Sequence, residues 1–549
     1  MSHEPVRPLP QLTPWNEWWW TAGRDGKLRF ARCPDCRSWV NPPQAHCPVC
    51  LRGAPSPEDV AGTATVIAVT VDVQPFMPGF VPPYAIAVVV CDEDPALRLT
   101  TNIVDCPPEA VHIGQRVAVG WDHQGDVWVP VFHPIDEPDR EVELPLPIRD
   151  APTPVGLQPK FEDGVVLSGI GMSQIGRRLM VDPLRLTVDA CLAAVADAGL
   201  TLSDIDGLST YPGPMGNGMS EGGASAVVEA LRLQPIWLNG GPETPGQIGS
   251  IIAAMLAVAS GLCRHVLCFR TVWEASWAQL GREGRLPSSP DRVSGTTMES
   301  RLPYGASSAA NWIALTASQY FHRFGGGRES LGWIALTARQ NAARNPHAIY
   351  RDPLTMDDYM DARMVSTPLG LYDCDVPCDG SVAVIVSAAD AAHDLAATPI
   401  QVEAVGTRIT ERLSWDQGTL THLPQIFGPA AHVWTRTDLR PSDIQVAELY
   451  DGFSFNCLSW LEALGFCGLG EGAAFVDGGK RIALDGELPL NTHGGQLSAG
   501  RTHGYGFVHE AVTQLRGTGG DRQVAGDPKL AMVAAGGGVP TGCFILRRD

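Results

Sequence analysis

The sequence is short of positive charge, and above all of lysine. Its 549 residues include 40 Lys and Arg against 60 Asp and Glu, a formal net charge of −20, and only four of the basic residues are lysines. A chain this acidic lacks the basic surface that nonspecific nucleic-acid binding requires, so we expect no nucleic-acid partner. Any anionic ligand must be met by a local cluster, which here means arginines.

Long apolar runs are also missing. The longest covers residues 251–263, about 13 residues, and is interrupted by Ser260 and Gly261. A membrane-spanning helix needs about 20 apolar residues, so no membrane span is expected. The first ten residues contain three prolines and no apolar segment of the kind found in secretory signals, which favours a cytoplasmic location.

Cysteine is sparse, at 14 residues, which argues against a disulfide scaffold. Four cysteines nevertheless form two CxxC pairs ten residues apart, and four thiolates provide the closed tetrahedral set that structural Zn²⁺ prefers. A catalytic metal would need an open coordination position, so we expect structural zinc, with redox use as the alternative. The predicted ligands are Cys33, Cys36, Cys47 and Cys50.

Eight prolines between residues 130 and 160 predict a linker between two modules. Before them, five β-rich runs bounded by Gly, Pro and Asp predict a small barrel. After them, strands and helices alternate, which is typical of a layered α/β fold, and the pattern restarts after Asp390. The five runs are Thr63–Val73, Tyr84–Val90, Leu97–Ile103, Gln115–Trp121 and Val127–Phe132.

Two further segments stand out. Residues 15–20, WNEWWW, predict a helix that either buries its tryptophans within its own module or docks on the C-terminal one. Residues 281–305 are rich in Gly, Ser, Pro and Arg, and a loop of that length usually forms a lid or a binding segment. Residues 169–176 have the spacing GxGxxxxG instead of GxGxxG, so we expect no dinucleotide-binding site.

The tryptophan-bearing helix, the four-cysteine ribbon and the five-stranded barrel, in that order, resemble the acyl-CoA-associated family called domain of unknown function 35. The resemblance covers roughly residues 11–135 and implies a rubredoxin-like zinc ribbon joined to an OB-fold. It also implies a partner module for thiolase-like enzymes, not a nucleic-acid OB-fold.

Residues 163–549 resemble the sterol-carrier-protein type of thiolase-like proteins. The resemblance is carried by VAELYDGF at 446–453, LEALGFC at 461–467, NTHGGQLSAG at 491–500, HGYG at 503–506 and QLRG at 514–517. It implies two similar α/β halves. The expected segments are therefore 11–57 (helix and zinc ribbon), 58–135 (OB-fold), 136–162 (linker), 163–395 and 396–549 (the two thiolase-like halves).

The thiolase catalytic set is absent. No cysteine lies between Gln234 and Leu262, where the resemblance implies the nucleophile; Arg501 takes the place of the Gly-His-Pro histidine and Ala534 that of the second cysteine. Thioester cleavage through an acyl-enzyme needs an activated thiolate, so that chemistry is excluded. Arg501 is either a phosphate or carbonyl contact or a solvated surface residue.

Two tyrosines mark further departures from the thiolase pattern. Tyr450 takes the place of the histidine that the resemblance implies before Asp-x-Phe, and Tyr505 lies in the loop that replaces Gly-His-Pro. This pattern resembles the steroid side-chain aldolases. We expect Tyr450 and Tyr505 to be the acid and base, His493 and His503 to orient groups or stabilise an enolate, and Asp451 to position Tyr450. The competing interpretation is a core tyrosine or a structural histidine at each position. The resemblance implies retro-aldol cleavage of a tertiary β-hydroxyacyl-CoA, such as a 17-hydroxy steroid with a three-carbon CoA side chain, to a 17-ketosteroid and propionyl-CoA.

The alternatives are a noncatalytic scaffold that binds acyl-CoA or lipid and a thiolase or condensing enzyme with an unrecognised nucleophile. CoA enters as part of the substrate, and we expect no bound cofactor other than zinc. Thiolase-like cores usually dimerise, so a homodimer is expected, and a hydratase is a possible partner.

Overall fold

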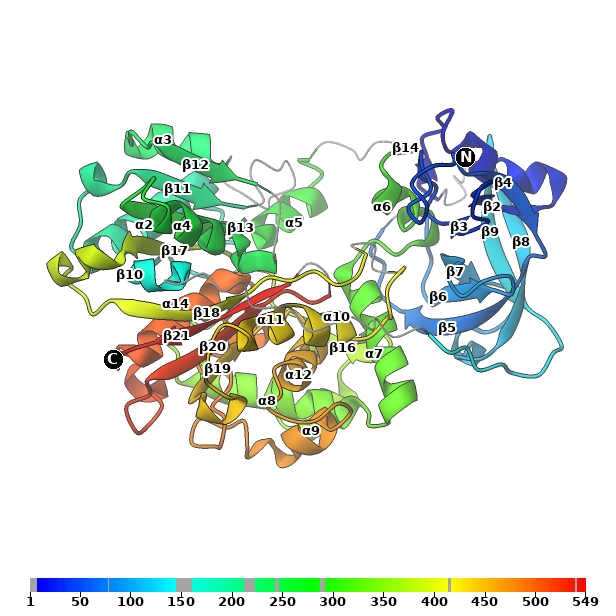
Figure 1. The fold of residues 1–549 in the computed structure, drawn as a ribbon. Helices are drawn as coiled ribbons and strands as arrows, with labels where there is room; N and C mark the ends of the chain where they lie inside the picture. Colours follow the sequence, from blue (N-terminus) through cyan, green and yellow to red (C-terminus); the bar gives the residue numbers. More distant parts are fainter. Residues whose placement is uncertain are drawn as a thin grey trace.

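A computed structural model describes residues 7–77, 79–144, 160–211, 223–241, 246–286, 292–412, 416–538 and 541–549. Figure 1 shows an N-terminal module, in blue and cyan, beside a larger C-terminal module that ends far from it. We call residues 7–144 the N-terminal module and residues 160–549 the C-terminal module. Most of the predicted 136–162 linker lies outside the described residues, whereas Leu144 still packs in a core with Ile67 and Val88 of the barrel.

The N-terminal module begins with the short helix α1 (Glu17–Trp20) and a three-stranded ribbon of order β3-β2-β4. A barrel follows, of order β5-β6-β7-β9-β8, which a pairing between β5 and β8 closes. Each of the five predicted runs forms one of its strands, so the ribbon-and-barrel prediction is confirmed. The strands are β2 (Leu28–Arg32), β3 (Trp39–Val40), β4 (Ser56–Val60), β5 (Thr63–Asp72), β6 (Tyr84–Cys91), β7 (Arg98–Ile103), β8 (Arg116–Gln124) and β9 (Val127–Pro134).

The tryptophans of α1 fulfil both interpretations of the WNEWWW segment. Trp19 lies in the barrel core, with its ring 5.0 Å from that of Phe30. Trp20 packs in a cluster with Val129 of the barrel and Tyr304 of the C-terminal module. The helix therefore seals its own module and also joins the two.

Backbone pairing links the modules at two further places. β15 (Met364–Ser366) extends the barrel sheet through Ser366 opposite Asp72 of β5, and β16 (Leu369–Gly370) follows it. β1 (Leu9–Pro10) pairs in parallel with β14 (Arg292–Val293), which lies in the segment predicted as a loop over 281–305. That segment is thus a connector to the N-terminal module.

The C-terminal module is built on a nine-stranded mixed sheet of order β12-β11-β13-β17-β10-β18-β21-β20-β19. The two halves meet where β10 pairs with β18, as Val166 opposite Gln401 shows. The layered α/β prediction is confirmed. The strands are β10 (Val165–Met172), β11 (Gly207–Thr210), β12 (Trp237–Gly240), β13 (His265–Trp273), β17 (Asp379–Ala388), β18 (Ile400–Gly406), β19 (Val446–Leu449), β20 (Leu530–Ala535) and β21 (Gly542–Arg547).

Helices cover both faces of this sheet. α2 and α3 pack against Leu267 and Ile385, whereas α4 packs against Val266 and Val384 on the other face, in one large core that also contains α14. Gly171 allows the close approach of α2, because a Cβ there would collide with the helix backbone at Ala190 and Ala194. The helices are α2 (Pro183–Ala198), α3 (Ala224–Leu231), α4 (Gly249–Ala259), α5 (Glu274–Arg282), α6 (Thr296–Glu299), α9 (Met356–Asp361), α10 (Leu423–Gln425), α11 (Ala431–Trp434), α12 (Ser454–Ala463), α13 (Gly472–Val476) and α14 (Gly504–Leu515).

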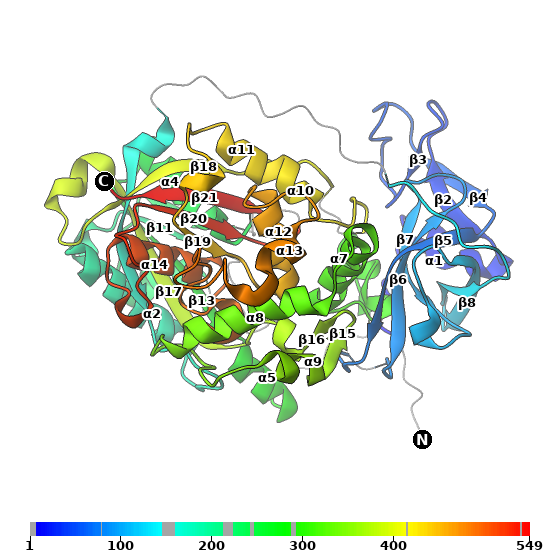
Figure 2. The same cartoon turned by 90° about the horizontal axis from the view of Figure 1, so that it is seen from below.

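The hexapeptide WIALTA occurs twice in the sequence, at residues 312–317 and 333–338. The two copies lie in α7 (Ala309–Phe324) and α8 (Arg328–Ala343), both of which bury apolar residues. Leu315 of α7 packs with Ile67 and Val88 of the barrel. Figure 2 shows α7 between the barrel and the rest of the C-terminal module. Among the described residues, no helix combines the length and the apolar character that crossing a membrane demands.

Candidate active site

The four predicted zinc ligands come together in the ribbon. Their sulfur atoms all lie within 4.8 Å of one another, with Cys33 and Cys50 Sγ 3.7 Å apart and Cys36 and Cys47 Sγ 3.5 Å apart. Four thiolates at this spacing fit a closed tetrahedral Zn²⁺ site with no position left for substrate, so zinc is structural here. It holds a ribbon whose strands are too short to form a stable core alone.

Tyr450 directly follows β19, and its hydroxyl accepts a hydrogen bond of 2.9 Å from Nε2 of Gln247. Gln247 lies in the helical turn Gly246–Ile248 that leads into α4. In a thiolase this position, the head of the helix after the third strand, would present the nucleophilic cysteine. Here it presents an amide to a phenol.

Asp451 is fully buried beside Tyr450. Its Oδ1 accepts a hydrogen bond of 2.7 Å from the backbone N–H of Gln496, which follows the tight glycine turn at Gly494 and Gly495. Burial raises the pKa of Asp451 to about 7, against the opposing effect of that hydrogen bond. The carboxyl group therefore titrates near neutrality.

His503 is the residue before α14, and guanidinium groups face both of its ring nitrogens. Arg270, within β13, places Nε and Nη2 at 3.2 and 3.1 Å from Nδ1, and Arg501 places Nε at 2.9 Å from Nε2. Burial and these two charges hold the pKa of His503 well below its usual value. The imidazole is therefore neutral at physiological pH.

Arg501 is anchored by two carboxylates and is not a solvated surface residue. Glu274 Oε2 and Asp375 Oδ2 each lie 3.1 Å from its guanidinium. Burial opposes its charge, but Asp375 and Glu274 raise the pKa of Arg501 above its usual value. Burial in turn raises the pKa of Asp375 to about 7, although Arg501 lowers it.

Tyr505 has hydrogen-bond and ring partners different from those of Tyr450. It is fully buried in the first turn of α14, and its hydroxyl is 2.6 Å from that of Ser250 in the first turn of α4. Its ring is 6.5 Å from that of Tyr211, whose hydroxyl lies 3.2 Å from Nδ1 of His503. Gln247 contacts the hydroxyl of Tyr450 and Ser250 contacts that of Tyr505. Both tyrosines are therefore held by residues at the start of α4.

His493 lies behind Phe507, whose ring is 5.4 Å from the imidazole of His493 and 6.2 Å from the ring of Tyr450. Its Nδ1 is 3.0 Å from Glu448 Oε2. Burial alone would lower the pKa of His493, but the hydrogen bond and charge of Glu448 raise it. His493 is therefore an ion-pair residue at the back of the site.

Several buried polar atoms around Tyr450 have no hydrogen-bond partner among the described residues. Such atoms are rare in folded proteins, so their gathering at one place marks a site prepared for a polar ligand. They are Gln247 Oε1, Glu274 Oε1, Asp451 Oδ2 and Gln496 Nε2.

The structure brings Tyr450, Asp451 and His503 together. Tyr505 instead contacts Ser250 and Tyr211, and His493 packs against Phe507. Four further residues of the site were not predicted from the sequence: Gln247, Arg270, Glu274 and Asp375. Glu274 could have been noticed, because it directly follows the buried strand β13, and charged residues at the carboxyl end of such a strand often face a ligand site.

Three family models match the chain. They are described as the ChsH2 rubredoxin-like zinc ribbon domain over residues 20–56, the ChsH2 C-terminal OB-fold domain over residues 57–122, and a thiolase C-terminal domain-like model over residues 416–546.

Two curated proteins are similar over most of their length. The steroid side-chain-cleaving aldolase of Thermomonospora curvata is 34% identical over 70% of this chain and 97% of its own. The 17-hydroxy-3-oxo-4-pregnene-20-carboxyl-CoA lyase of Mycobacterium tuberculosis is 35% identical over 69% of this chain and 97% of its own.

Among solved structures, an Ltp2-ChsH2(DUF35) aldolase matches with a TM-score of 0.61 and 31% identity, over 70% of this chain and 98% of its own. Human mitochondrial 3-ketoacyl-CoA thiolase, at 15% identity and a TM-score of 0.50 over 71% of this chain and 100% of its own, shares the fold alone.

Proposed function

Because the chain belongs to the family of steroid side-chain-cleaving aldolases, carbon–carbon lyases that act on CoA thioesters, we propose that it cleaves a tertiary β-hydroxyacyl-CoA to a ketone and a shorter acyl-CoA. The proposed substrate is a 17-hydroxy steroid with a three-carbon CoA side chain, and the products are a 17-ketosteroid and propionyl-CoA. The observation that carries the proposal is the hydrogen bond from Gln247 to Tyr450 at the place of the thiolase nucleophile.

The reaction needs a base and an acid but no covalent intermediate. The base takes the proton of the β-hydroxyl, the Cα–Cβ bond breaks, and its electron pair moves onto the thioester as an enolate while the ketone forms. The acid then protonates Cα, so the reaction consumes no net proton. A tertiary alcohol cannot be oxidised to the ketone that thiolysis requires, which explains why a lyase would act here.

We propose Tyr450 and Tyr505 as the acid–base pair, without assigning which residue performs which step. The hydrogen bond from Gln247 stabilises a phenolate at Tyr450, and the nearby charge of Arg501 acts in the same sense. Asp451 would position Tyr450 by fixing the turn after β19. His493 is proposed to keep that region in place through Glu448.

The enolate would be stabilised by preorganised donors in the same place. Arg501 carries a fixed positive charge, and His503, whose ring nitrogens face Arg501 and Arg270, would orient Arg501. Donors aimed in advance at a developing oxyanion supply much of the rate enhancement in enzymes of this type. The unpartnered Nε2 of Gln496 is a buried donor that fits the same use.

The thiolase alternative has less support. Cys378 lies beside Gly500 and within the electrostatic influence of Arg501, but burial raises its pKa well above its usual value. A thiol in that state is a poor nucleophile.

We also propose a homodimer. Within the described residues, β12 is one edge of the nine-stranded sheet, and Ile236 and Leu238 are 68% and 48% exposed there. An apolar edge strand favours pairing with another copy. A hydratase that forms the tertiary alcohol from an unsaturated acyl-CoA is the proposed functional partner, and the cytoplasm, where CoA thioesters are handled, is the proposed location.

The test is incubation of the full chain with a tertiary β-hydroxyacyl-CoA and no free CoA, followed by mass detection of both products. We expect ketone and short acyl-CoA in equal amounts. Failure to cleave several ring systems by a zinc-loaded, folded protein would contradict the proposal, and a requirement for free CoA would favour a thiolase.

A further inference from the structure

Residues 375–378 join the two loops that carry Tyr450 and Arg501. Backbone hydrogen bonds tie this short segment to both loops and to the first residue of α5. The bonds run from Asp375 N to Gly452 O at 3.1 Å, from Val376 N to Gln496 O at 3.0 Å, from Arg501 N to Val376 O at 2.9 Å and from Glu274 N to Cys378 O at 3.1 Å. The segment therefore fixes these parts of the site relative to one another.

Within this frame, two carboxylates hold the guanidinium of Arg501 through different nitrogens. Asp375 Oδ2 lies 3.1 Å from Nε, and Glu274 Oε2 lies 3.1 Å from Nη1. Glu274 is the first residue of α5, where the helix dipole favours a negative charge. His503 adds a contact, with its Nε2 at 2.9 Å from Nε of Arg501. A planar guanidinium held at several points keeps one orientation.

One nitrogen of Arg501 is left over by these contacts. Nη2 donates no hydrogen bond to any described residue, and the side chain is 27% exposed, so a ligand oxygen can reach it. Tyr450 is among the groups whose charge raises the pKa of Arg501, which places the guanidinium near the phenol. A donor held in advance at this place is what a developing oxyanion needs.

A cavity of about 340 Å³ opens beside Asp375. Two other arginines, Arg177 and Arg339, line the same cavity, but neither forms an ion pair with Asp375. Among the residues that the structure describes, Arg501 is the only cation within ion-pair distance of this carboxylate. The charge of Asp375 is therefore directed at Arg501.

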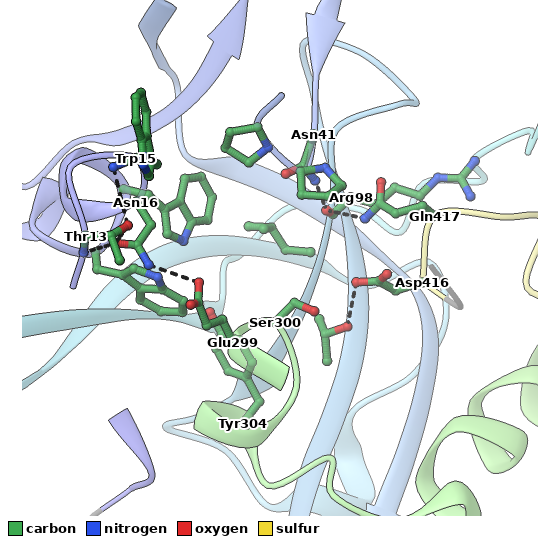
Figure 3. A pocket seen from close by; sticks show the side chains of 16 residues that line it. Thr13, Trp15, Asn16, Asn41, Arg98, Glu299, Ser300, Tyr304, Asp416 and Gln417 are labelled. Atoms are coloured by element: carbon green, nitrogen blue, oxygen red, sulfur yellow. Dashed lines mark hydrogen bonds between the residues drawn. The ribbon is translucent and has the colours of Figure 1, made fainter. Parts of the chain in front are cut away.

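The cavity between the two modules differs from this one. It has a volume of about 280 Å³ and takes Trp15 and Asn41 from the N-terminal module and Glu299 from the C-terminal module (Figure 3). None of the described residues that line it belongs to the active site. Of these two cavities, only the one beside Asp375 borders the site.

We propose that Asp375 and Glu274 are positioning residues of the lyase, which together hold the guanidinium of Arg501 so that its Nη2 bonds to the oxygen of the thioester enolate. The inference rests on the proposed function, because it takes the enolate as the species that Arg501 stabilises. Both carboxylates act through Arg501, so neither has an effect on the reaction once Arg501 is absent.

The test removes each carboxylate charge and keeps the shape of the side chain. Asp375→Asn and Glu274→Gln should each lower kcat about tenfold at unchanged KM, because the guanidinium loses its orientation while substrate binding remains. Rates are measured at pH 8, since burial raises the pKa of Asp375 to about 7 and the carboxylate prevails above it. Asp92→Asn, which weakens an ion pair with Arg116 in the barrel, is the matched control and should keep both constants.

A double-mutant cycle separates positioning from a merely structural role. Arg501→Ala should lower kcat by about 10²- to 10³-fold, the usual effect of losing an oxyanion donor, and adding Asp375→Asn should then change kcat by less than about twofold. Losses that multiply, or an unchanged kcat in both single variants, would overturn the inference. Arg501→Lys, whose single ammonium cannot hold both carboxylates in the same way, replaces Arg501→Ala where urea unfolding shows that the alanine variant is not folded.

Hydrogen exchange at Cα tests the inference without cleavage. In D₂O, the site should exchange a Cα hydrogen of propionyl-CoA: the C–H electron pair moves into the enolate, the proton passes to a base of the site, and a solvent deuteron returns to Cα. Mass spectrometry measures the deuterium, and Asp375→Asn should slow its uptake about tenfold.

The two proposals fail in different ways. Exchange that depends on Asp375 in a protein that cleaves no β-hydroxyacyl-CoA would contradict the lyase function and retain the positioning role. Cleavage by the wild type, with neither rate changed in Asp375→Asn, would do the reverse. A wild-type protein that performs neither reaction would overturn both.

Discussion

At the scale of single residues, the acid–base role proposed for Tyr450 depends on its neighbours. Gln247 donates to its hydroxyl, Arg501 contributes positive charge, and Asp451 lies beside it as a carboxyl group that titrates near neutrality. A free phenol has a pKa near 10, so stabilisation of the phenolate is what acid–base use at neutral pH demands.

The first prediction concerns the hydroxyl of Tyr450. Tyr450→Phe should lower kcat by about 10²- to 10⁴-fold, the usual share of a general acid or base, with little change in KM. Initial rates of ketone formation measure this. Tyr84→Phe, which removes a buried hydroxyl bonded to Asp72 in the barrel, controls for loss of stability and should retain kcat. Equal losses in both variants would mean that Tyr450 is structural.

The second prediction concerns stability and pH. Burial raises the folded-state pKa of Asp451 to about 7, above the 3.8 of an exposed carboxyl, so the folded state holds this proton more tightly than the unfolded state does. The stability it contributes is present at low pH and is lost as pH rises from about 4 to about 7. Asp451→Asn should therefore raise the unfolding free energy at pH 8 relative to wild type by more than at pH 5.

Urea unfolding of wild type and variant at the two pH values measures this difference. The exposed carboxyl of Asp189 provides the control, since Asp189→Asn should show no such pH dependence. A pH-independent difference for Asp451→Asn would contradict the assigned ionisation.

Three of the site residues expected from the sequence, Tyr450, Asp451 and His503, lie together. Each belongs to a sequence motif and also sits in a turn that ends a strand or begins a helix. Gln247 and Arg270 could not be recognised in the same way. Each belongs to an element predicted for its apolar content, and their meeting with Tyr450 and His503 depends on packing between the two halves. A single sequence carries no signal for such a meeting.

At the scale of elements, local and nonlocal strands differ in how well they could be predicted. The barrel strands are bounded by Gly, Pro and Asp and agree with prediction within a few residues. β17 is buried along almost its whole length, so it lacks the alternation that identifies a strand. β15 is three residues long and pairs with a strand about 290 positions earlier, which no local pattern indicates.

The ribbon provides the third prediction. Elemental analysis should find about one zinc per chain, and Cys47→Ser should lose it, because three thiolates and an alcohol bind Zn²⁺ far less tightly than four thiolates. Cys106→Ser, in the barrel, is the control and should keep its zinc. Full zinc content in Cys47→Ser would contradict the ligand assignment.

At the scale of the whole molecule, some arginines of the acidic chain gather in clusters. Arg270 and Arg501 face the two ring nitrogens of His503, and Arg301 and Arg412 line one cavity. The sequence indicated that an anionic substrate would need such clusters, but not where they would form. Their positions depend on contacts between residues hundreds of positions apart.

The fourth prediction concerns assembly. Leu238→Asp, on the exposed face of β12, should convert a dimer into a monomer, because a charge on an edge strand opposes pairing between copies. Light scattering coupled to size exclusion measures the mass. Leu469→Asp, at another exposed leucine, should remain dimeric. A wild-type chain that is already monomeric would contradict the dimer proposal.

The pairing of β15 with β5 gives the joining of the modules a further consequence. Ser366 lies opposite Asp72, and the hydroxyls of Thr70 and Ser366 are 2.8 Å apart, so residues of the C-terminal module extend the barrel sheet. Because both modules belong to one polypeptide, each C-terminal module is synthesised together with one barrel. Neither part depends on the cellular concentration of the other, and a mismatched barrel from a related enzyme would have to displace one that is already tethered in place.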